Sequence, residues 1–303
     1  MIAVVRSGAA KIRAGFVAFA AGDAFGAPWE GMASEEVAGA DLSRLPQRED
    51  WPRGATSDDT AQLVLAAEAL CAGGELQREF MVRLAGEFPR IRGVGPTTSE
   101  AVRRWRESGS MGVASGTTNG AAMRVLAVGW AAPADNPAVR REMALALSRA
   151  THGAPGALIA AGVVAAMGSW SLAGSSIDSL CREAVAEAAR LREALGADVP
   201  LDQLAAAADG TWTPPAAGIS LDAMETAAAV LHVLRGARGL SDGIETSVRL
   251  GGDTDTVAAI VGGILGVRDE DPEDALPWLS LVQLPDPALL DRLAAGLWER
   301  RSG

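Results

Sequence analysis

The sequence predicts an all-α protein, and three observations support this. Apolar residues make up 49% of the 303-residue chain, and many of them are alanine, the residue with the highest helix propensity. Aromatic residues make up 4% and tyrosine is absent, so strand-forming residues are scarce. Apolar residues recur at helical spacing in successive segments separated by glycine and proline. No repeat or linker divides the chain, so we expect one compact helical domain, residues 1–303.

The first half of the chain contains helical patterns of different lengths. An apolar helix is expected over 9–21, and the glycine-containing stretch 22–30 after it is predicted to be a loop. Ser57, a good N-cap residue, begins a helix that reaches about Cys71. The other elements expected in this half are helices at 76–88 and 99–107, a glycine-rich loop at 112–120, and a helix from there to Trp130.

The second half continues the helical pattern. Helices are expected at 137–150 and 155–170, and 182–195 is a charged, alanine-rich helix with a polar face toward solvent. The proline-containing segment 196–221 is the least regular part and is a candidate flap over a site. The remaining predicted helices are 222–235, 243–250, 254–266 and 287–300.

Charge and composition exclude several classes of protein. A net charge of −11 disfavours binding to nucleic acid or to anionic membranes. Cys71 and Cys181 lie in apolar helical patterns and are predicted to be buried thiols rather than a disulfide. The short apolar run 16–21 leads directly to Asp23, unlike a signal peptide, and no run approaches about 18 apolar residues. We expect a cytoplasmic monomer.

Two acidic clusters each precede an apolar helical run. They are Ser57-Asp58-Asp59-Thr60 and Asp253-Thr254-Asp255-Thr256. One interpretation is helix capping, because Ser57 and Asp253 are good N-cap residues and acidic side chains complement the helix dipole. A cap needs one acceptor, however, whereas each cluster supplies two carboxylates and two hydroxyls. Grouped carboxylates away from water require a cation or protonation, so the sequence favours a metal site.

The ligand types indicate which cation would bind. Carboxylate and hydroxyl oxygens suit Mg²⁺, Mn²⁺ or Ca²⁺, and zinc is disfavoured because His152 and His232 lie in neither cluster. Residues i and i+2 diverge on a helix, so Asp253 and Asp255 would share an ion in a turn that enters the helix. Gly251 and Gly252 before them allow backbone conformations that other residues resist. Four aspartates suffice for two ions if the fold brings the clusters together.

Two further acids lie in the stretch 22–30. Glu30 is either an ordinary loop carboxylate or a third acid of the site. Asp23 is expected to hydrogen-bond backbone amides rather than to react.

At these segments the chain resembles the ADP-ribosylglycohydrolase family, which includes the dinitrogenase-reductase-activating glycohydrolases. Five stretches match family motifs in order along almost the whole chain. They are the opening helix with its G-D-A-x-G-A-P-x-E loop (12–30), the [S/T]-D-D-T motif (57–60), the N-G-x-x-M-R loop (119–124), the T-H segment (151–153) and the second metal motif (250–266). Each match is weak alone, but five in order are specific.

The resemblance implies an all-α fold with two Mg²⁺ or Mn²⁺ ions at its centre. It implies a hydrolase that cleaves the glycosidic bond of ADP-ribose attached to a protein side chain or small molecule. Glu30, Asp58 and Asp59 would form the catalytic group, with Glu30 as a ligand or as the carboxylate that moves protons. The implied ligands are Ser57, Asp58 and Asp59 for one ion and Asp253 and Thr256 for the other, with Asp255 bridging. The implied ADP-ribose contacts are Ser115, Gly116, Asn119, Gly120, Ala121, Met123 and, near the ribose, His152, whose alternative role is structural.

The chain departs from the family pattern at Gly93, where many relatives carry an aspartate that could bind a cationic arginine leaving group. This departure disfavours arginine-linked substrates. Two alternatives to the hydrolase remain at this point: a non-catalytic relative that binds ADP-ribose or serves structurally, and a different dinuclear helical hydrolase that acts on nucleotide phosphates.

Overall fold

The computed structural model describes residues 7–48, 50–268 and 271–303. Within these ranges the chain forms helices and three isolated β-bridges but no strand, which confirms the all-α class. The α-helices are α1 (Gly8–Gly26), α2 (Ser34–Ala38), α3 (Asp58–Ala72), α4 (Leu76–Glu87), α5 (Pro96–Ser108), α6 (Leu126–Ala131), α7 (Pro137–Arg149), α8 (Pro155–Leu172), α9 (Ile177–Ala194), α10 (Asp202–Asp209), α11 (Ala223–Gly236), α12 (Leu240–Arg249), α13 (Thr254–Gly266), α14 (Pro272–Ala275) and α15 (Pro287–Ser302). Short 3₁₀ turns are η1 (Ala27–Trp29), η2 (Phe88–Arg90), η3 (Asn119–Ala121) and η4 (Leu279–Leu281).

Most predicted helices are present, but several of their bounds differ from the prediction. The first helix continues to Gly26, so the prediction of a loop over 22–30 was wrong for its first five residues. Ala24 and Phe25 in this stretch are buried, and the core stabilises the extra turn. Helix α9 begins earlier than expected, at Ile177. Helix α10 lies inside the segment predicted to be irregular, and the short α2 was not predicted.

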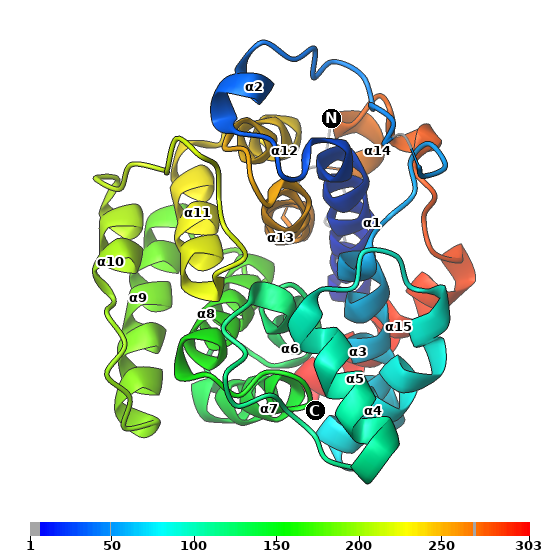
Figure 1. The fold of residues 1–303 in the computed structure, drawn as a ribbon, viewed down its shortest axis with the longest axis vertical. Coiled ribbons are helices and arrows are strands. Elements are labelled where there is room, and N and C mark those ends of the chain that lie inside the picture. Colours follow the sequence, from blue (N-terminus) through cyan, green and yellow to red (C-terminus); the bar gives the residue numbers. More distant parts are fainter. Residues whose placement is uncertain (1–6, 49, 269–270) are drawn as a thin grey trace.

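Helices α1 and α13 pack along each other in the middle of the molecule (Figure 1). Their backbones approach closely because glycines face the contact. A Cβ atom on Gly22 would lie 2.2 Å from the carbonyl oxygen of Ala258, and one on Gly26 would lie 2.5 Å from the Cα of Asp255. The end of α1 is therefore held against the beginning of α13, which brings the segments around residues 30 and 253 together.

Replacing Gly22 by alanine should destabilise the protein although alanine is the better helix former. The new methyl group would meet rigid backbone, and such overpacking costs about 1–3 kcal/mol, more than the gain of at most about 1 kcal/mol in helix propensity. Gly86 in α4 is the matched control, because a Cβ there has no neighbour within 4 Å. Urea unfolding should show a loss of stability for Gly22→Ala and a small gain for Gly86→Ala; equal stability of the two variants would contradict the close packing.

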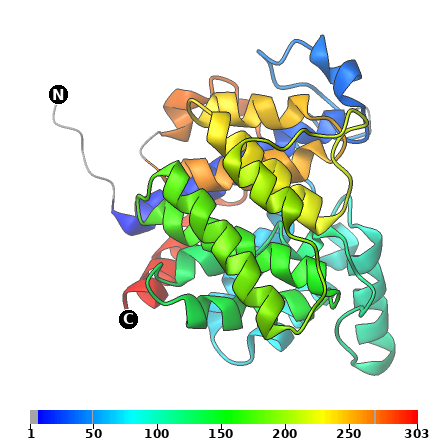
Figure 2. The ribbon, with the colours of Figure 1, turned by 90° about the vertical axis from the view of Figure 1, so that its left-hand side faces the viewer.

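Helix α8 lies in the core between α6, α7, α9 and α11, and α9, α10 and α11 cover one side of the molecule (Figure 2). Among the described residues it is the helix whose length of 18 residues and mean hydropathy of 1.5 could cross a membrane, so the expectation that no run approaches about 18 apolar residues was wrong for this segment. Because 83% of it is buried inside the protein, these properties are those of a core helix. Both cysteines are free, but Cys71 is exposed, so its predicted burial was wrong, whereas Cys181 is buried.

Candidate active site

The first acidic cluster lies at the beginning of α3. Ser57 is the N-cap residue, and its Oγ accepts a hydrogen bond of 3.1 Å from the backbone amide of Asp59. The amides of Ser57 and Thr60 donate to the buried carboxylate of Asp23 in α1, at 2.9 and 3.0 Å. The expectation that Asp23 binds backbone amides is confirmed. Asp23 therefore anchors the start of α3 to α1 and places Asp58 and Asp59 in the first buried turn.

The second cluster lies at the beginning of α13. Gly251 and Gly252 both have φ of +71°, and a Cβ on Gly252 would lie 2.0 Å from the carbonyl oxygen of Ile219. The expected need for glycine in this turn is confirmed. Asp253 occupies the N-cap position but its side chain makes no capping hydrogen bond. Its Oδ2 accepts from the side-chain amide of Asn119 instead, so helix capping does not explain this carboxylate.

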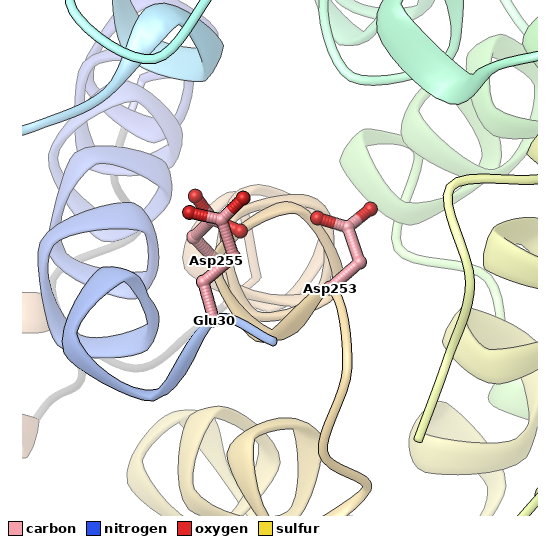
Figure 3. A group of neighbouring side chains, drawn as sticks. All are labelled: Glu30, Asp253 and Asp255. Atoms are coloured by element: carbon pink, nitrogen blue, oxygen red, sulfur yellow. The ribbon is translucent and has the colours of Figure 1, made fainter. Parts of the chain in front are cut away.

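The two clusters meet, although 197 positions separate Thr256 from Asp59. The Oγ1 of Thr256 donates to Asp59 Oδ2 at 3.3 Å, and the Oγ of Ser57 donates to the same oxygen at 3.0 Å. Carboxylate oxygens of Glu30, Asp253 and Asp255 lie within 4.8 Å of one another, and Figure 3 shows them on the same side of the first turn of α13. The fold thus brings Glu30, Asp58, Asp59, Asp253 and Asp255 together in one acidic centre. They come from the end of η1, which follows α1, and from the beginnings of α3 and α13.

The acidic centre carries more negative charge than its buried surroundings tolerate. Burial, then repulsion from Asp23, raises the pKa of Asp58 to about 8, and burial raises the pKa of Asp253 to about 6. The pKa values of Asp59 and Asp255 are also raised well above the ordinary range, first by burial and then by neighbouring carboxylates. In such a setting, ionised carboxylates require a cation.

Glu30 differs from the aspartates because it lies at the edge of the centre and its side chain is 37% exposed. Arg48 binds it, with 2.6 Å between Nη1 and Glu30 Oε2, and also donates to the carbonyl oxygen of Ala27 at 3.3 Å. The guanidinium group of Arg48 lies 4.5 Å from the ring centroid of Trp51. Arg48, packed on Trp51, therefore holds the Glu30 side chain in place beside the aspartates.

A cleft of about 280 Å³ opens above the acidic centre. Its polar lining includes Glu30, the four aspartates of the clusters, Thr256, Thr98, Thr118 and Asn119. Gly120 and Met123 also line it, as does an apolar rim formed by Trp51, Val94, Pro96 and Leu221. Of the segment 196–221, proposed above as a flap, Leu221 at its end contributes to the lining and is 45% exposed.

The predicted ADP-ribose contacts divide into two groups. Asn119, Gly120 and Met123 line the cleft. Ser115 is exposed on the loop before them, Gly116 and Ala121 are buried, and all three lie outside the lining. His152 is fully buried behind the wall of the cleft that Asn119, Gly120 and Met123 form. A Cβ on Gly120 would lie 2.9 Å from the His152 ring, which shows how closely the wall packs on it.

His152 does not line the cleft itself but contacts the hydroxyl group of Thr118, which does. Its Nδ1 lies 2.7 Å from Thr151 Oγ1, and its Nε2 lies 2.9 Å from the Oγ1 of Thr118, which lines the cleft. Burial, then the positive charge of Arg124, lowers the pKa of His152 to about 3. With such a pKa the ring is neutral at physiological pH, and a neutral ring can donate to one of these two hydroxyl groups and accept from the other.

The structure adds residues that sequence reasoning missed. Arg48 and Trp51 lie in a polar connection without periodicity, and no local pattern identifies them. Leu221 reaches the rim because Asn119 N binds its carbonyl oxygen at 3.0 Å, a contact between distant segments. Gln62, which binds Asp58 at 2.6 Å, could have been found, because positions i and i+4 share a helix face.

The acidic centre fits a divalent cation. The Oδ1 atom of Asp59 is buried and has no hydrogen-bond partner among the residues that the structure describes, which is unfavourable for a carboxylate oxygen unless another group binds it. The surrounding donors are carboxylate and hydroxyl oxygens, the set that Mg²⁺ and Mn²⁺ prefer. No described histidine or cysteine lies among them.

Comparisons with known proteins agree with this arrangement. The family model described as ADP-ribosylglycohydrolase matches residues 6–303. A solved structure called "ADP-ribosylglycohydrolase-related protein complex" superposes with a TM-score of 0.77 at 27% identity, covering 97% of this chain and 98% of that one. An "Uncharacterized protein" of Archaeoglobus fulgidus is 26% identical over 302 residues, 95% of this chain and 96% of its own length. The chain therefore belongs to the ADP-ribosylglycohydrolase family.

Proposed function

We propose that this protein is a metal-dependent hydrolase that releases ADP-ribose from a protein side chain or a small molecule. The observation that carries the proposal is the buried acidic centre at the floor of the cleft, where Oδ1 of Asp59 has no hydrogen-bond partner within the described ranges. A purely structural protein gains nothing from four buried carboxylates with raised pKa values, because each one destabilises the fold at neutral pH. The family membership supplies the substrate class.

Two Mg²⁺ or Mn²⁺ ions would be held by the residues of the two clusters. We assign Ser57, Asp58 and Asp59 to one ion, Asp253 and Thr256 to the other, and Asp255 to both. A divalent cation in this position supplies positive charge that polarises oxygen atoms of the substrate and stabilises developing negative charge. The protein supplies hard oxygen ligands whose positions are fixed by the starts of α3 and α13.

The protein's own side chains position the substrate and move protons. Asn119, Gly120 and Met123 form the wall on which ADP-ribose would lie, and the rim with Trp51 and Leu221 limits the access of water. Glu30 is the group placed to transfer a proton, because it faces the centre and still contacts solvent. Cleavage at an anomeric carbon builds positive charge on the sugar and negative charge on the leaving group, so a proton donor or base beside the bond lowers the barrier.

Replacing Glu30 by glutamine should slow hydrolysis by about 10²–10⁴-fold, the usual contribution of one general acid or base. The amide keeps the size of the side chain and can still accept a hydrogen bond from Arg48, so the fold should be unchanged. Single-turnover release of ADP-ribose measures the effect, with thermal unfolding as the check on folding. Full activity in a folded Glu30→Gln variant would remove Glu30 from the mechanism.

The reaction itself is tested with serine- and arginine-ADP-ribosylated peptides and with O-acetyl-ADP-ribose, each incubated with Mg²⁺, Mn²⁺ or EDTA. We expect free ADP-ribose in the presence of metal and none in EDTA. Weak release from the arginine peptide would follow from Gly93, which offers no carboxylate to a guanidinium group. If ADP-ribose binds but no substrate is cleaved with either metal, the chain is a binding module and the proposal fails.

A further inference from the structure

Gln62 links the metal-site carboxylate Asp58 to a buried arginine. Its Nε2 donates to Asp58 Oδ2 at 2.6 Å, and its Oε1 accepts from Arg124 Nη1 at 3.0 Å. Gln62 and Arg124 are both fully buried. Because a guanidinium group only donates hydrogen bonds, the amide oxygen of Gln62 faces Arg124. Its NH₂ group must then face Asp58, so the direction of the amide is fixed.

Arg124 has no carboxylate in direct contact among the described residues; its hydrogen bonds go to neutral groups. Nη1 also donates to the carbonyl oxygen of Gly120 at 2.8 Å. Nη2 donates to the carbonyl oxygen of Leu147 at 3.1 Å and to Thr151 Oγ1 at 2.6 Å. Its guanidinium carbon lies 4.4 Å from the ring centroid of Phe80. One side chain thus joins α3, α4, α7 and the cleft wall.

Burying such a charge has an unfavourable desolvation free energy, so the charge adds little to the stability of the fold. Burial lowers the pKa of Arg124 to about 9, so the group is still charged at neutral pH, and its Nε finds no partner among the described residues. Apolar side chains that fill the same space are often as stabilising as buried charges or more so. A role in the adjacent site accounts better for an arginine at this position.

The hydrogen bond from Gln62 also determines how the Asp58 carboxylate is oriented. Oδ2 is occupied by the amide, whereas Oδ1 lies 3.5 Å from the Cβ position of Gly93, a residue that lines the cleft. Free rotation of the carboxylate would exchange the two oxygens. With Gln62 held by Arg124, Oδ1 is the oxygen presented to the cleft.

We propose that Arg124 and Gln62 are positioning residues of the metal centre: Arg124 fixes the Gln62 amide, and Gln62 fixes Asp58 so that Oδ1 is available to a cation. Arg124 also binds the carbonyl oxygen of Gly120. The same guanidinium group therefore fixes the position of the metal ligand Asp58 relative to the cleft wall. This inference rests on the proposed metal-dependent function.

The test is Mn²⁺ binding, measured from the electron paramagnetic resonance signal of the free ion, with no substrate present. Gln62→Met keeps the volume but removes both hydrogen bonds, and Arg124→Lys keeps a charge that cannot reach Gln62, Gly120 and Thr151 together. The control is Ser171→Ala, which removes a buried hydrogen bond of 2.6 Å to Ile264 outside the cleft lining. Unfolding in EDTA verifies that each variant is folded.

We expect Gln62→Met and Arg124→Lys to weaken Mn²⁺ binding about 10–100-fold, the usual effect of removing a group that orients a ligand. The double variant should bind Mn²⁺ only slightly less tightly than whichever single variant binds it more weakly, because both substitutions break the same connection. If folded Gln62→Met binds Mn²⁺ as tightly as Ser171→Ala, the positioning role is overturned while the metal centre stands. If the wild-type protein binds no Mn²⁺, the metal centre and the positioning role both fail.

Discussion

Replacing Asp255 by asparagine should strongly slow the proposed metal-dependent hydrolysis and, in the absence of metal, make the protein more stable. Asp255 lies in the first turn of α13 next to Glu30 and Asp253, and it is the residue assigned to both ions. Burial, then repulsion from Asp253 and Asp59, raises its pKa well above the ordinary value. The charge that would bind the cation is thus a charge that the fold tolerates poorly without one.

The two effects should have opposite signs in one variant. Loss of a ligand shared by both ions should lower the rate of ADP-ribose release by about 10²–10³-fold or more, as for other central electrostatic groups. In EDTA the buried carboxyl group must keep a proton that the unfolded chain has released, a cost that the neutral amide avoids, and about 1 kcal/mol or more of unfolding free energy should be gained. The hydrogen bond from Thr256 N to Asp255 Oδ1 can be kept by the asparagine oxygen.

The matched control is Asp242→Asn on the surface of α12. Asp242 is paired with Arg238 at 2.6 Å, and its pKa is lowered, chiefly by that hydrogen bond. Its substitution should therefore leave catalysis unchanged and stabilise nothing. Urea unfolding in EDTA and in Mg²⁺, with the hydrolysis assay, compares the two. An Asp255→Asn variant that loses stability in EDTA would show that the carboxylate has a structural role instead.

The sequence predicted the helical class because helix formation depends on local composition and on apolar spacing, both of which are visible in one chain. Helix α13 was predicted with its observed bounds, 254–266, since its apolar run is framed by glycine and aspartate. The end of α1 was missed for a physical reason. In the local sequence, Gly22 and Gly26 resemble loop residues. In the structure they allow the backbone of α13 to approach closely, and a contact between distant segments cannot be predicted from local sequence.

The same limit applies to the candidate site. Both aspartate clusters were found because each is dense in oxygen ligands beside an apolar helix. Their meeting through Thr256 and Asp59, and the pairing of Arg48 with Glu30, are products of tertiary structure. Arg124 was noticed as part of a motif, yet its connection to Asp58 required the buried geometry of Gln62.

Removing the metal should also make stability depend on pH in an unusual direction. In EDTA the unfolding free energy should fall as the pH rises from 6.5 to 8. Asp58, with a pKa raised to about 8, and Asp59 and Asp255, with pKa values raised well above the ordinary range, keep protons in the folded state that the unfolded chain has released. Their contribution is fully present below the unfolded pKa of aspartate and is lost as the pH rises through the folded values.

Asp23, whose pKa is also raised by burial, acts in the same direction, whereas the histidines and Arg124 do not. His152 and His232 have pKa values lowered by burial, so their effect is to make stability rise with pH, and it fades only as the pH rises above the unfolded pKa of about 6.5. It therefore offsets part of the fall in the lower half of the window and little of it near pH 8. Arg124, with a pKa of about 9, titrates above the window. Each excess proton in the folded state should give a slope of about 1.4 kcal/mol per pH unit.

Urea unfolding at several pH values between 6.5 and 8, in EDTA and in Mg²⁺, measures the slope. We expect Mg²⁺ to remove it, because a bound cation favours the ionised carboxylates in the folded state. Asp58→Asn should reduce the slope in EDTA, since one of the titrating groups is gone. A stability in EDTA that is constant or rises over this range would mean that the four aspartates are already compensated without a cation, and the central argument for a metal centre would no longer hold.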